Sequence, residues 1–308
     1  MKIIFLGTPD FSASILECLI SSRHDIVGVV TQPDKESGRG HKVLPTPVKV
    51  LAQKHNIPVY QFKRISKECD VLKELNADIM ITAAYGQILR QNVLDLTPKG
   101  VINVHASLLP KYRGSSPIQW CIIKGEEETG VTIMKTDIGV DTGDMILAKK
   151  VNIASDETAG ELFDKLSNLG KEALLEALDL IESGEATYTP QDHEKMSHYP
   201  MLDKESGKID FSANAKDIVN LCRGLNPWPV AFINLDEQNK LKVYKASVVA
   251  TTDNSPCGTV LCCDSKNGLV IKCGDSAVSL DIIQTAGTKA MPAKDYLRGR
   301  KLLINNIL

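Results

Sequence analysis

The N-terminal part of the chain alternates between short apolar runs and amphipathic stretches. The apolar runs are rich in β-branched residues and predict strands, whereas apolar positions spaced three and four residues apart predict helices between them. Strands that alternate with helices at such short intervals indicate a Rossmann-like, mostly parallel α/β sheet covered on both faces. The predicted strands are 2–6, 25–31, 58–60, 78–83 and 100–104, and the predicted helices are 11–21, 46–56 and 66–76.

The pattern changes in the second half of the chain. Two strands, 131–135 and 144–153, flank a turn, and a helix follows whose apolar stripe runs from Leu162 to Ile181. No periodicity is visible across 190–207, where prolines and mixed charges predict a linker. After a short helix, several short strands separated by turn residues indicate a small OB-like β-barrel. We therefore expect a first domain over 1–189, a linker over 190–207 and a C-terminal barrel over 208–308.

Composition is that of a globular protein without covalent or metal cross-links. The chain has 308 residues and is 43% hydrophobic, enough for two cores. None of its eight cysteines forms a C-x-x-C pair, so we expect free thiols, with neither disulfides nor a metal site. The apolar start is too short for a signal peptide and no run is long enough to span a bilayer, which predicts a cytoplasmic location.

Charge is distributed unevenly between the two halves. The net charge is -2, but residues 208–308 contain 13 basic and 9 acidic side chains, so this part carries +4 and the remainder -6. A mildly basic C-terminal domain is compatible with phosphate contacts, although a bias of this size is common. The long segment 32–45 holds the run Gly38-Arg39-Gly40-His41-Lys42, which predicts either a functional basic loop or a solvated surface loop.

Chemistry is concentrated at the end of strand 100–104. Residues alternate across a strand, so Asn103 and His105 project to the same side, where an amide and an imidazole can hold an oxygen that becomes negative. The Asp-rich turn after 131–135, with Asp137, Asp141 and Asp144, can bring a carboxylate to the imidazole. Since no serine or cysteine nucleophile accompanies them, the set favours direct acyl transfer between two bound substrates. The alternative is that Asn103 and His105 only satisfy the sheet end.

Two common nucleotide-binding classes are disfavoured. The residues after the first strand, Gly7-Thr8-Pro9-Asp10, do not form G-x-G-x-x-G, and the chain has no G-x-x-x-x-G-K-[ST] motif. These absences argue against a nicotinamide-dependent oxidoreductase and a P-loop NTPase.

Several segments resemble the 10-formyltetrahydrofolate-dependent formyltransferases. The likeness rests on the block from Asn103 to Gly114, the turn from Asp137 to Asp144, the opening 5–11 and the segment 84–89. Two further segments, Asn226-Pro227-Trp228-Pro229 and 295–300, extend it over nearly the whole chain and resemble the members that act on methionyl-tRNA.

The resemblance implies roles for individual residues. Asn103, His105 and Asp141 would be catalytic, with Asn103 and His105 stabilising an oxyanion while Asp141 orients the imidazole. The family's basic loop, which enters the tRNA acceptor arm, corresponds to the segment around Arg39; His41 stands where a second basic residue is frequent. The implied formyl-donor residues are Tyr85, Gly86, Ser107, Leu108, Leu109, Pro110, Asp137 and Gly139. The implied tRNA contacts are Arg39, Lys42, Arg113, Lys242, Lys245, Arg298 and Arg300.

The expected reaction is transfer of the formyl group of 10-formyltetrahydrofolate to the α-amine of initiator methionyl-tRNA by a monomeric enzyme. Two alternatives remain. A sister enzyme that formylates a small amine would keep the three catalytic residues but would need neither the Arg39 loop nor a C-terminal barrel. A non-catalytic RNA- or folate-binding protein would be marked by loss of the catalytic set, which is intact.

Overall fold

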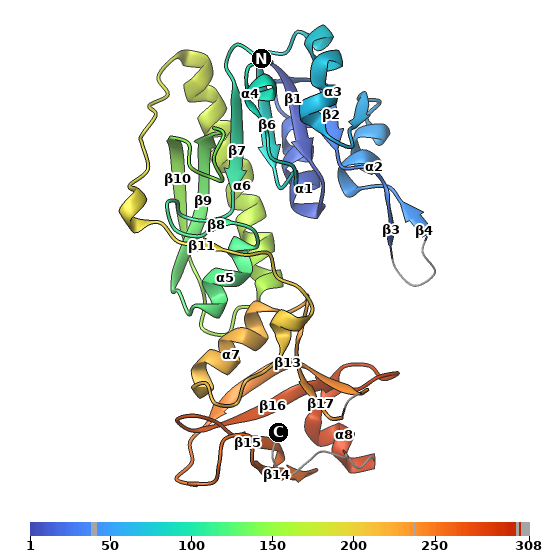
Figure 1. The fold of residues 1–308 in the computed structure, drawn as a ribbon, viewed down its shortest axis with the longest axis vertical. Coiled ribbons are helices and arrows are strands. Elements are labelled where there is room, and N and C mark those ends of the chain that lie inside the picture. Colours follow the sequence, from blue (N-terminus) through green and yellow to red (C-terminus); the bar gives the residue numbers. More distant parts are fainter. Residues whose placement is uncertain (38–41, 237, 300–301, 303–308) are drawn as a thin grey trace. The chain divides into compact units, whose positions relative to one another are not determined.

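A computed structural model describes residues 1–37, 42–236, 238–299 and 302 (Figure 1). The chain divides into two compact units, each made of several segments. The first unit contains residues 1–114, 129–151 and 163–198, and the second contains 115–128, 152–162 and 199–308.

The first unit is built on a seven-stranded sheet with the order β10-β9-β7-β6-β1-β2-β5. Neighbours from β5 to β7 pair in parallel, and β9 pairs with β7 in the antiparallel sense. The sheet is therefore mostly parallel, as the alternating pattern predicts. The strands are β1 Lys2–Gly7, β2 Asp25–Thr31, β5 Val59–Gln61, β6 Ile79–Ala83, β7 Val101–His105, β9 Glu128–Lys135 and β10 Met145–Asn152.

Both faces of this sheet are covered. Strand β1 is buried from Ile3 onward, and its Ile4 and Leu6 pack in one apolar cluster with Leu72 and Val93. Gly170 of α6 lies against Ile15 of α1 and Val104 of β7, which places these two helices together on the sheet. The helices of this unit are α1 Asp10–Ile20, α2 Pro47–Lys54, α3 Ile65–Glu68, η1 Cys69–Leu75, α4 Gln91–Leu94, η2 His193–Lys195 and most of α6 Ala159–Ser183.

Two regions differ from the sequence expectations. The helix expected over 66–76 is a short α-helix followed by the 3-10 helix η1, which ends at Asn76 in a left-handed conformation. The segment 32–45 contains a small antiparallel pair, β3 Lys35–Ser37 and β4 Lys42–Leu44. Arg39 lies outside the described residues.

The second unit holds an antiparallel sheet with the order β12-β13-β16-β15-β14, and β17 pairs with β16. Helix α7 packs on β13, and its Ile218 and Cys222 join a core with Leu241, Val243 and Ile283. The strands are β12 Ala231–Asn234, β13 Lys240–Val249, β14 Val260–Asp264, β15 Gly268–Lys272, β16 Ala277–Gln284 and β17 Met291–Pro292; the helices are α5 Pro117–Ile123, η3 Glu205–Gly207, α7 Ala215–Gly224 and α8 Ala293–Gly299. Two short strands, β8 Arg113–Gly114 and β11 His198–Tyr199, lie at segment ends.

Within the described ranges, no helix combines the length and the apolar character needed to cross a membrane.

Candidate active site

Asn103 and His105 lie at the carboxyl end of β7, as the sequence predicts. The side chain of Asn103 is half-buried, whereas His105 is 6% exposed. The flanking Ile102 and the intervening Val104 are buried, and they face the opposite side of the sheet because alternate residues of a strand do so. The strand therefore presents the amide and the imidazole on the same side.

The amide of Asn103 is oriented by the neighbouring strand. Thr82 of β6 is paired with Asn103 across the parallel ladder, and its hydroxyl donates a 2.8 Å hydrogen bond to Asn103 Oδ1. In this orientation the amide oxygen is the acceptor from Thr82, and the NH₂ group is at the opposite end of the amide. In the described part of the chain, Asn103 Nδ2 donates no hydrogen bond, so it is available to a bound oxygen.

The imidazole of His105 is hydrogen-bonded at one ring nitrogen and faces a carboxylate at the other. Nε2 lies 2.9 Å from the backbone carbonyl oxygen of Tyr112, and because a carbonyl only accepts, Nε2 carries a hydrogen. Nδ1 lies 3.7 Å from Asp141 Oδ2. In this orientation both ring nitrogens face acceptors of the protein. A second hydrogen-bond donor to an oxyanion, as expected from the sequence, would require His105 to leave one of these partners.

Asp141 reaches His105 from a tightly constructed turn. Its Oδ2 accepts a 2.8 Å hydrogen bond from the backbone N–H of Gly114. The turn closes on itself because Asp137 Oδ1 accepts from Gly139 N and from Thr142 Oγ1. Gly143 passes so close to the strand that an added Cβ would lie 1.8 Å from the carbonyl oxygen of Lys135, so only glycine fits there.

Left-handed backbone conformations are concentrated around this site. Tyr112 and Asp141 have φ values of 59° and 52°, and Ala84 has a φ of 45°. Bulky residues rarely adopt this region, and it persists where the surrounding structure determines it. Tyr112 supplies the carbonyl group that holds His105, and Asp141 supplies the carboxylate, so the unusual conformations coincide with the contacts of the imidazole.

The residues expected to bind the formyl donor differ in their exposure to solvent. Gly86 and Gly139 are exposed, and Leu108 and Pro110 are half-buried. The side chain of Tyr85, in contrast, is 4% exposed and packs in the apolar cluster beneath the sheet, and burial raises its pKa.

The other residues expected to bind the formyl donor make hydrogen bonds within the protein. Ser107 is fully buried and its hydroxyl donates to Lys111 O. Leu109 is 7% exposed, and its backbone N–H donates to Thr132 Oγ1. Asp137 is half-buried and organises the turn described above.

Three exposed apolar side chains on the loops 84–89 and 137–144 were not expected from the sequence. Ile88 is 71% exposed, Ile138 is 70% exposed and Val140 is 48% exposed. Large exposed aliphatic side chains on loops at a sheet edge can contact the flat rings of a ligand. The sequence shows only where they stand: Ile138 and Val140 lie in the Asp-rich turn, and Ile88 lies three residues after Tyr85.

The expected tRNA contacts fall in different environments. Lys242 and Lys245 are exposed on β13, and Arg298 is exposed near the end of α8. Arg113, however, is 3% exposed, and its guanidinium donates to Gln191 and His193 of the same unit. A buried and internally bonded guanidinium does not fit the predicted contact with phosphate. Arg39 and Arg300 lie outside the described residues, as does the side chain of Lys42.

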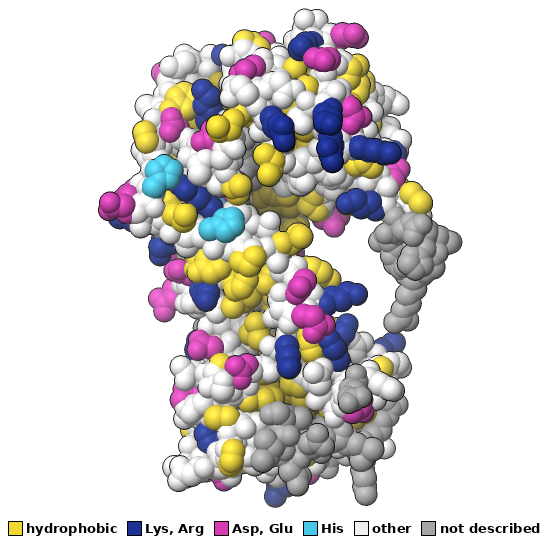
Figure 2. All heavy atoms as spheres, in the orientation of Figure 1, with side chains coloured by type: hydrophobic (Ala, Val, Ile, Leu, Met, Phe, Trp, Pro, Cys, Tyr) yellow, Lys and Arg dark blue, Asp and Glu magenta, His cyan; other side chains and the backbone are white. Residues whose placement is uncertain are grey.

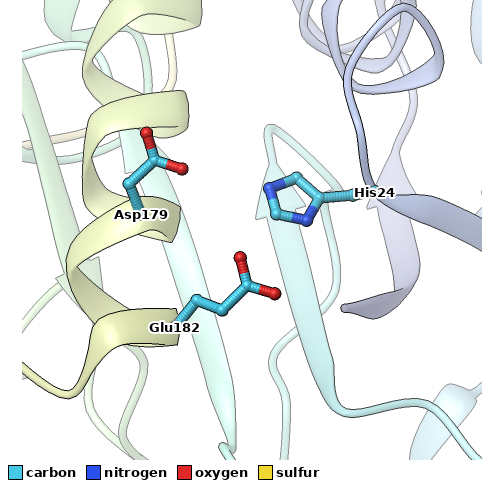
Figure 3. A group of neighbouring side chains, drawn as sticks. All are labelled: His24, Asp179 and Glu182. Atoms are coloured by element: carbon cyan, nitrogen blue, oxygen red, sulfur yellow. The ribbon is translucent and has the colours of Figure 1, made fainter.

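A separate cluster of titratable groups lies away from this site (Figure 3). Asp179 and Glu182, on one face of α6, point toward His24. Both carboxylates already pair with Arg23, at 2.8 and 2.6 Å. The cluster is therefore explained as an ion-pair network within the protein.

Comparisons with known proteins agree with the resemblance seen in the sequence. Residues 1–178 match the family described as formyl transferase, and residues 201–301 match its C-terminal domain. The chain is 46% identical over 311 residues to the methionyl-tRNA formyltransferase of Alkaliphilus oremlandii, covering 100% of this chain and 99% of that protein. It is 46% identical over 304 residues to the methionyl-tRNA formyltransferase of Clostridioides difficile, covering 98% of each.

Solved structures share the fold at low sequence identity. A sugar 3N-formyl transferase, WlaRD, solved in the presence of dTDP and 5-N-formyl-THF, has a TM-score of 0.67 at 20% identity and covers 94% of this chain and 99% of its own. An N-formyltransferase from Helicobacter canadensis in complex with folinic acid and dTDP-3-aminofucose has a TM-score of 0.66 at 19% identity, covering 90% and 98%. These matches confirm the predicted fold class, a Rossmann-like domain followed by a domain of antiparallel strands.

Proposed function

Because the chain belongs to the formyl transferase family, we propose that it transfers the formyl group of 10-formyltetrahydrofolate to the α-amino group of methionyl-tRNA. The substrate pair follows from relatives that share 46% identity over essentially the full length of both proteins. The product is N-formylmethionyl-tRNA, which is used to initiate translation. The alternative, a small-amine substrate, is not favoured, since the sugar formyltransferases are only 19–20% identical.

One observation carries the assignment of the site. The Thr82 hydroxyl fixes the oxygen end of the Asn103 amide, which leaves Nδ2 as the donor at the open end of β7. When the α-amine attacks the formyl carbon, the carbonyl oxygen gains negative charge, and a preoriented N–H that faces it lowers the barrier. We assign this role to Asn103.

We assign proton transfer to the His105–Asp141 pair. Attack forms the new C–N bond and leaves a proton on the former amine nitrogen; breaking the bond from carbon to N10 of the folate requires a proton on N10. With Nε2 donating to Tyr112 O, Nδ1 is the ring atom that can accept and return this proton beside the Asp141 carboxylate. A neutral amine is itself the nucleophile, so no covalent enzyme intermediate is required.

The donor is proposed to bind against the loops 84–89 and 137–144. Their exposed Ile88, Ile138 and Val140 provide an apolar surface for the pterin and benzoyl rings, and the exposed backbone at Gly86 and Gly139 allows close approach. We do not assign a ligand contact to the buried side chains of Tyr85 or Ser107; they shape the loops.

The tRNA is proposed to bind through distributed basic residues. Lys242, Lys245 and Arg298 are exposed in the second unit, and Arg39 and Lys42 belong to the basic loop of the first. On the face drawn in Figure 2, basic and acidic side chains are interspersed over the second unit rather than gathered in one patch. Since the proposed catalytic residues all come from one chain, we propose that the enzyme works as a monomer, in the cytoplasm where its substrates occur.

Formylation by the purified protein tests this function. We expect 10-formyltetrahydrofolate to support rapid formylation of initiator methionyl-tRNA, slower formylation of elongator methionyl-tRNA and none of glycinamide ribonucleotide. Efficient formylation of the small amine without methionyl-tRNA would instead assign the protein to the sister activity.

A further inference from the structure

A buried polar pair outside the proposed catalytic set connects the linker to the active-site turn. Gln191, in the segment where sequence periodicity is lost, is 5% exposed, and Arg113 is 3% exposed. Arg113 Nε and Nη2 both donate to Gln191 Oε1, at 3.1 and 2.7 Å. We call these two side chains the Arg113–Gln191 clamp.

The other end of the Gln191 amide holds the turn that carries Asp141. Gln191 Nε2 donates to the backbone carbonyl oxygen of Asp141 at 2.9 Å and to that of Gly143 at 2.7 Å. The chain next to it is fixed by reciprocal backbone hydrogen bonds between Met145 and Thr189, each 2.9 Å long. All four hydrogen-bonding positions of the amide, two donors and two acceptor lone pairs, are therefore used.

The clamp closes a loop of contacts around His105. Residues 112–114 hold the imidazole through Tyr112 O and the Asp141 carboxylate through Gly114 N. Arg113, between them, is tied through Gln191 to the backbone of the same Asp141. Both the carboxylate and the backbone of Asp141 are therefore connected by hydrogen bonds to residues 112–114, the backbone by way of Gln191. These contacts stabilise the left-handed conformation of Asp141, whose φ is 52°.

Burial of the Arg113 guanidinium costs free energy and calls for a structural explanation. A buried guanidinium without an anionic partner is unfavourable, and no carboxylate of the described residues forms an ion pair with Arg113. Its Nη1 instead donates to His193 Nδ1 at 3.3 Å, which requires that ring nitrogen to be unprotonated. Two of the guanidinium's donors bind the Gln191 amide oxygen, so this buried charge fixes the position of the Gln191 side chain.

We infer that Gln191 is a positioning residue for formyl transfer, which keeps the Asp141 carboxylate against His105. The inference rests on the proposed function, because it requires Asp141 to act in the reaction. It predicts that loss of the Gln191 donors lowers kcat about 10- to 100-fold, since misplacement of a reacting group by about 1 Å can cost 10²-fold. The KM values for both substrates should change less than about threefold, because Gln191 is buried and its amide is bonded within the protein.

The sharpest variant is Gln191→Glu. It keeps an acceptor for Arg113, gives that cation a partner and so preserves the clamp, but it replaces the NH₂ group that holds Asp141 and Gly143 with an acceptor. Gln191→Met, of similar size and without hydrogen bonds, provides a second test. Met196→Ala, in the same linker and 47% exposed, is the matched control and should retain wild-type kcat.

A double-mutant cycle with Asp141→Asn separates positioning from general stability. If Gln191 acts through Asp141, Gln191→Glu should slow the wild-type enzyme strongly and the Asp141→Asn enzyme by less than about threefold. Equal slowing in both backgrounds, or unchanged kcat in both Gln191 variants, overturns the inference. If the Asp141→Asn enzyme has wild-type activity, the proposed role of Asp141 is wrong, and so is the inference about Gln191. If Asp141→Asn is slow but the Gln191 variants have wild-type kcat, only the positioning role of Gln191 is wrong.

Discussion

The hydroxyl of Thr82 donates a 2.8 Å hydrogen bond to the side-chain oxygen of Asn103, across two adjacent parallel strands. This contact decides which end of the Asn103 amide faces the open end of the sheet. The Asn103 NH₂ group is therefore a hydrogen-bond donor with a defined direction.

Replacing Thr82 by valine tests this relationship. Thr82→Val keeps the shape of a buried strand residue and removes the hydrogen bond, so the amide can rotate. A neutral hydrogen bond is worth about 1 kcal/mol, which corresponds to an expected loss of about fivefold in single-turnover formylation rate. Thr129→Val, at another buried strand threonine, is the control. Equal rates for the two variants would show that Thr82 does not orient the amide.

The basic loop gives a prediction on salt dependence. Arg39→Ala should raise KM for methionyl-tRNA, leave KM for the folate unchanged, and reduce the slope of log affinity against log salt by about one, as for loss of one phosphate contact. Lys67→Ala, which removes an exposed charge from α3, controls for net charge. A raised KM for the folate with unchanged tRNA binding would remove the loop from the tRNA site.

The group of His24, Asp179 and Glu182 in Figure 3 predicts how stability depends on pH. Burial lowers the pKa of His24 below its ordinary 6.5; the positive charges of the Met1 amine and Arg23 lower it further, while Glu182 and Asp179 raise it. The unfolded state therefore binds the proton more readily. The stabilisation is complete above about pH 6.5 and is lost as pH falls through the lower folded-state pKa.

We accordingly expect the melting temperature of the wild type to fall more between pH 7.5 and 5.5 than that of His24→Gln. The difference between the two proteins at pH 7.5 gives the pH-independent effect of the substitution. Parallel curves over this range would mean that His24 contributes nothing to the pH dependence.

The sequence predicts those parts of the fold that depend on local periodicity. The apolar runs correspond to β1, β2, β6 and β7, and the two-residue alternation places Asn103 and His105 on one side of β7. These features follow from side-chain direction along a strand, which a single sequence contains.

Contacts between segments distant in the chain could not be read in the same way. Arg113 looks like a phosphate ligand because arginine usually lies at the surface, yet it is buried against Gln191, 78 positions later. Gln191 itself lies where the pattern ends, and nothing local marks it as a buried residue. Thr82 was visible as a polar residue in an apolar strand, but its partner depends on the register of β6 and β7.

We propose that the fixed amide of Asn103 stabilises the oxyanion of formyl transfer. The most direct measurement is the single-turnover rate of formyl transfer to methionyl-tRNA for Asn103→Ala, with both substrates saturating. We expect a loss of about 10²–10³-fold, as for removal of one preoriented oxyanion donor, at an unchanged melting temperature. A rate within twofold of the wild type would contradict it.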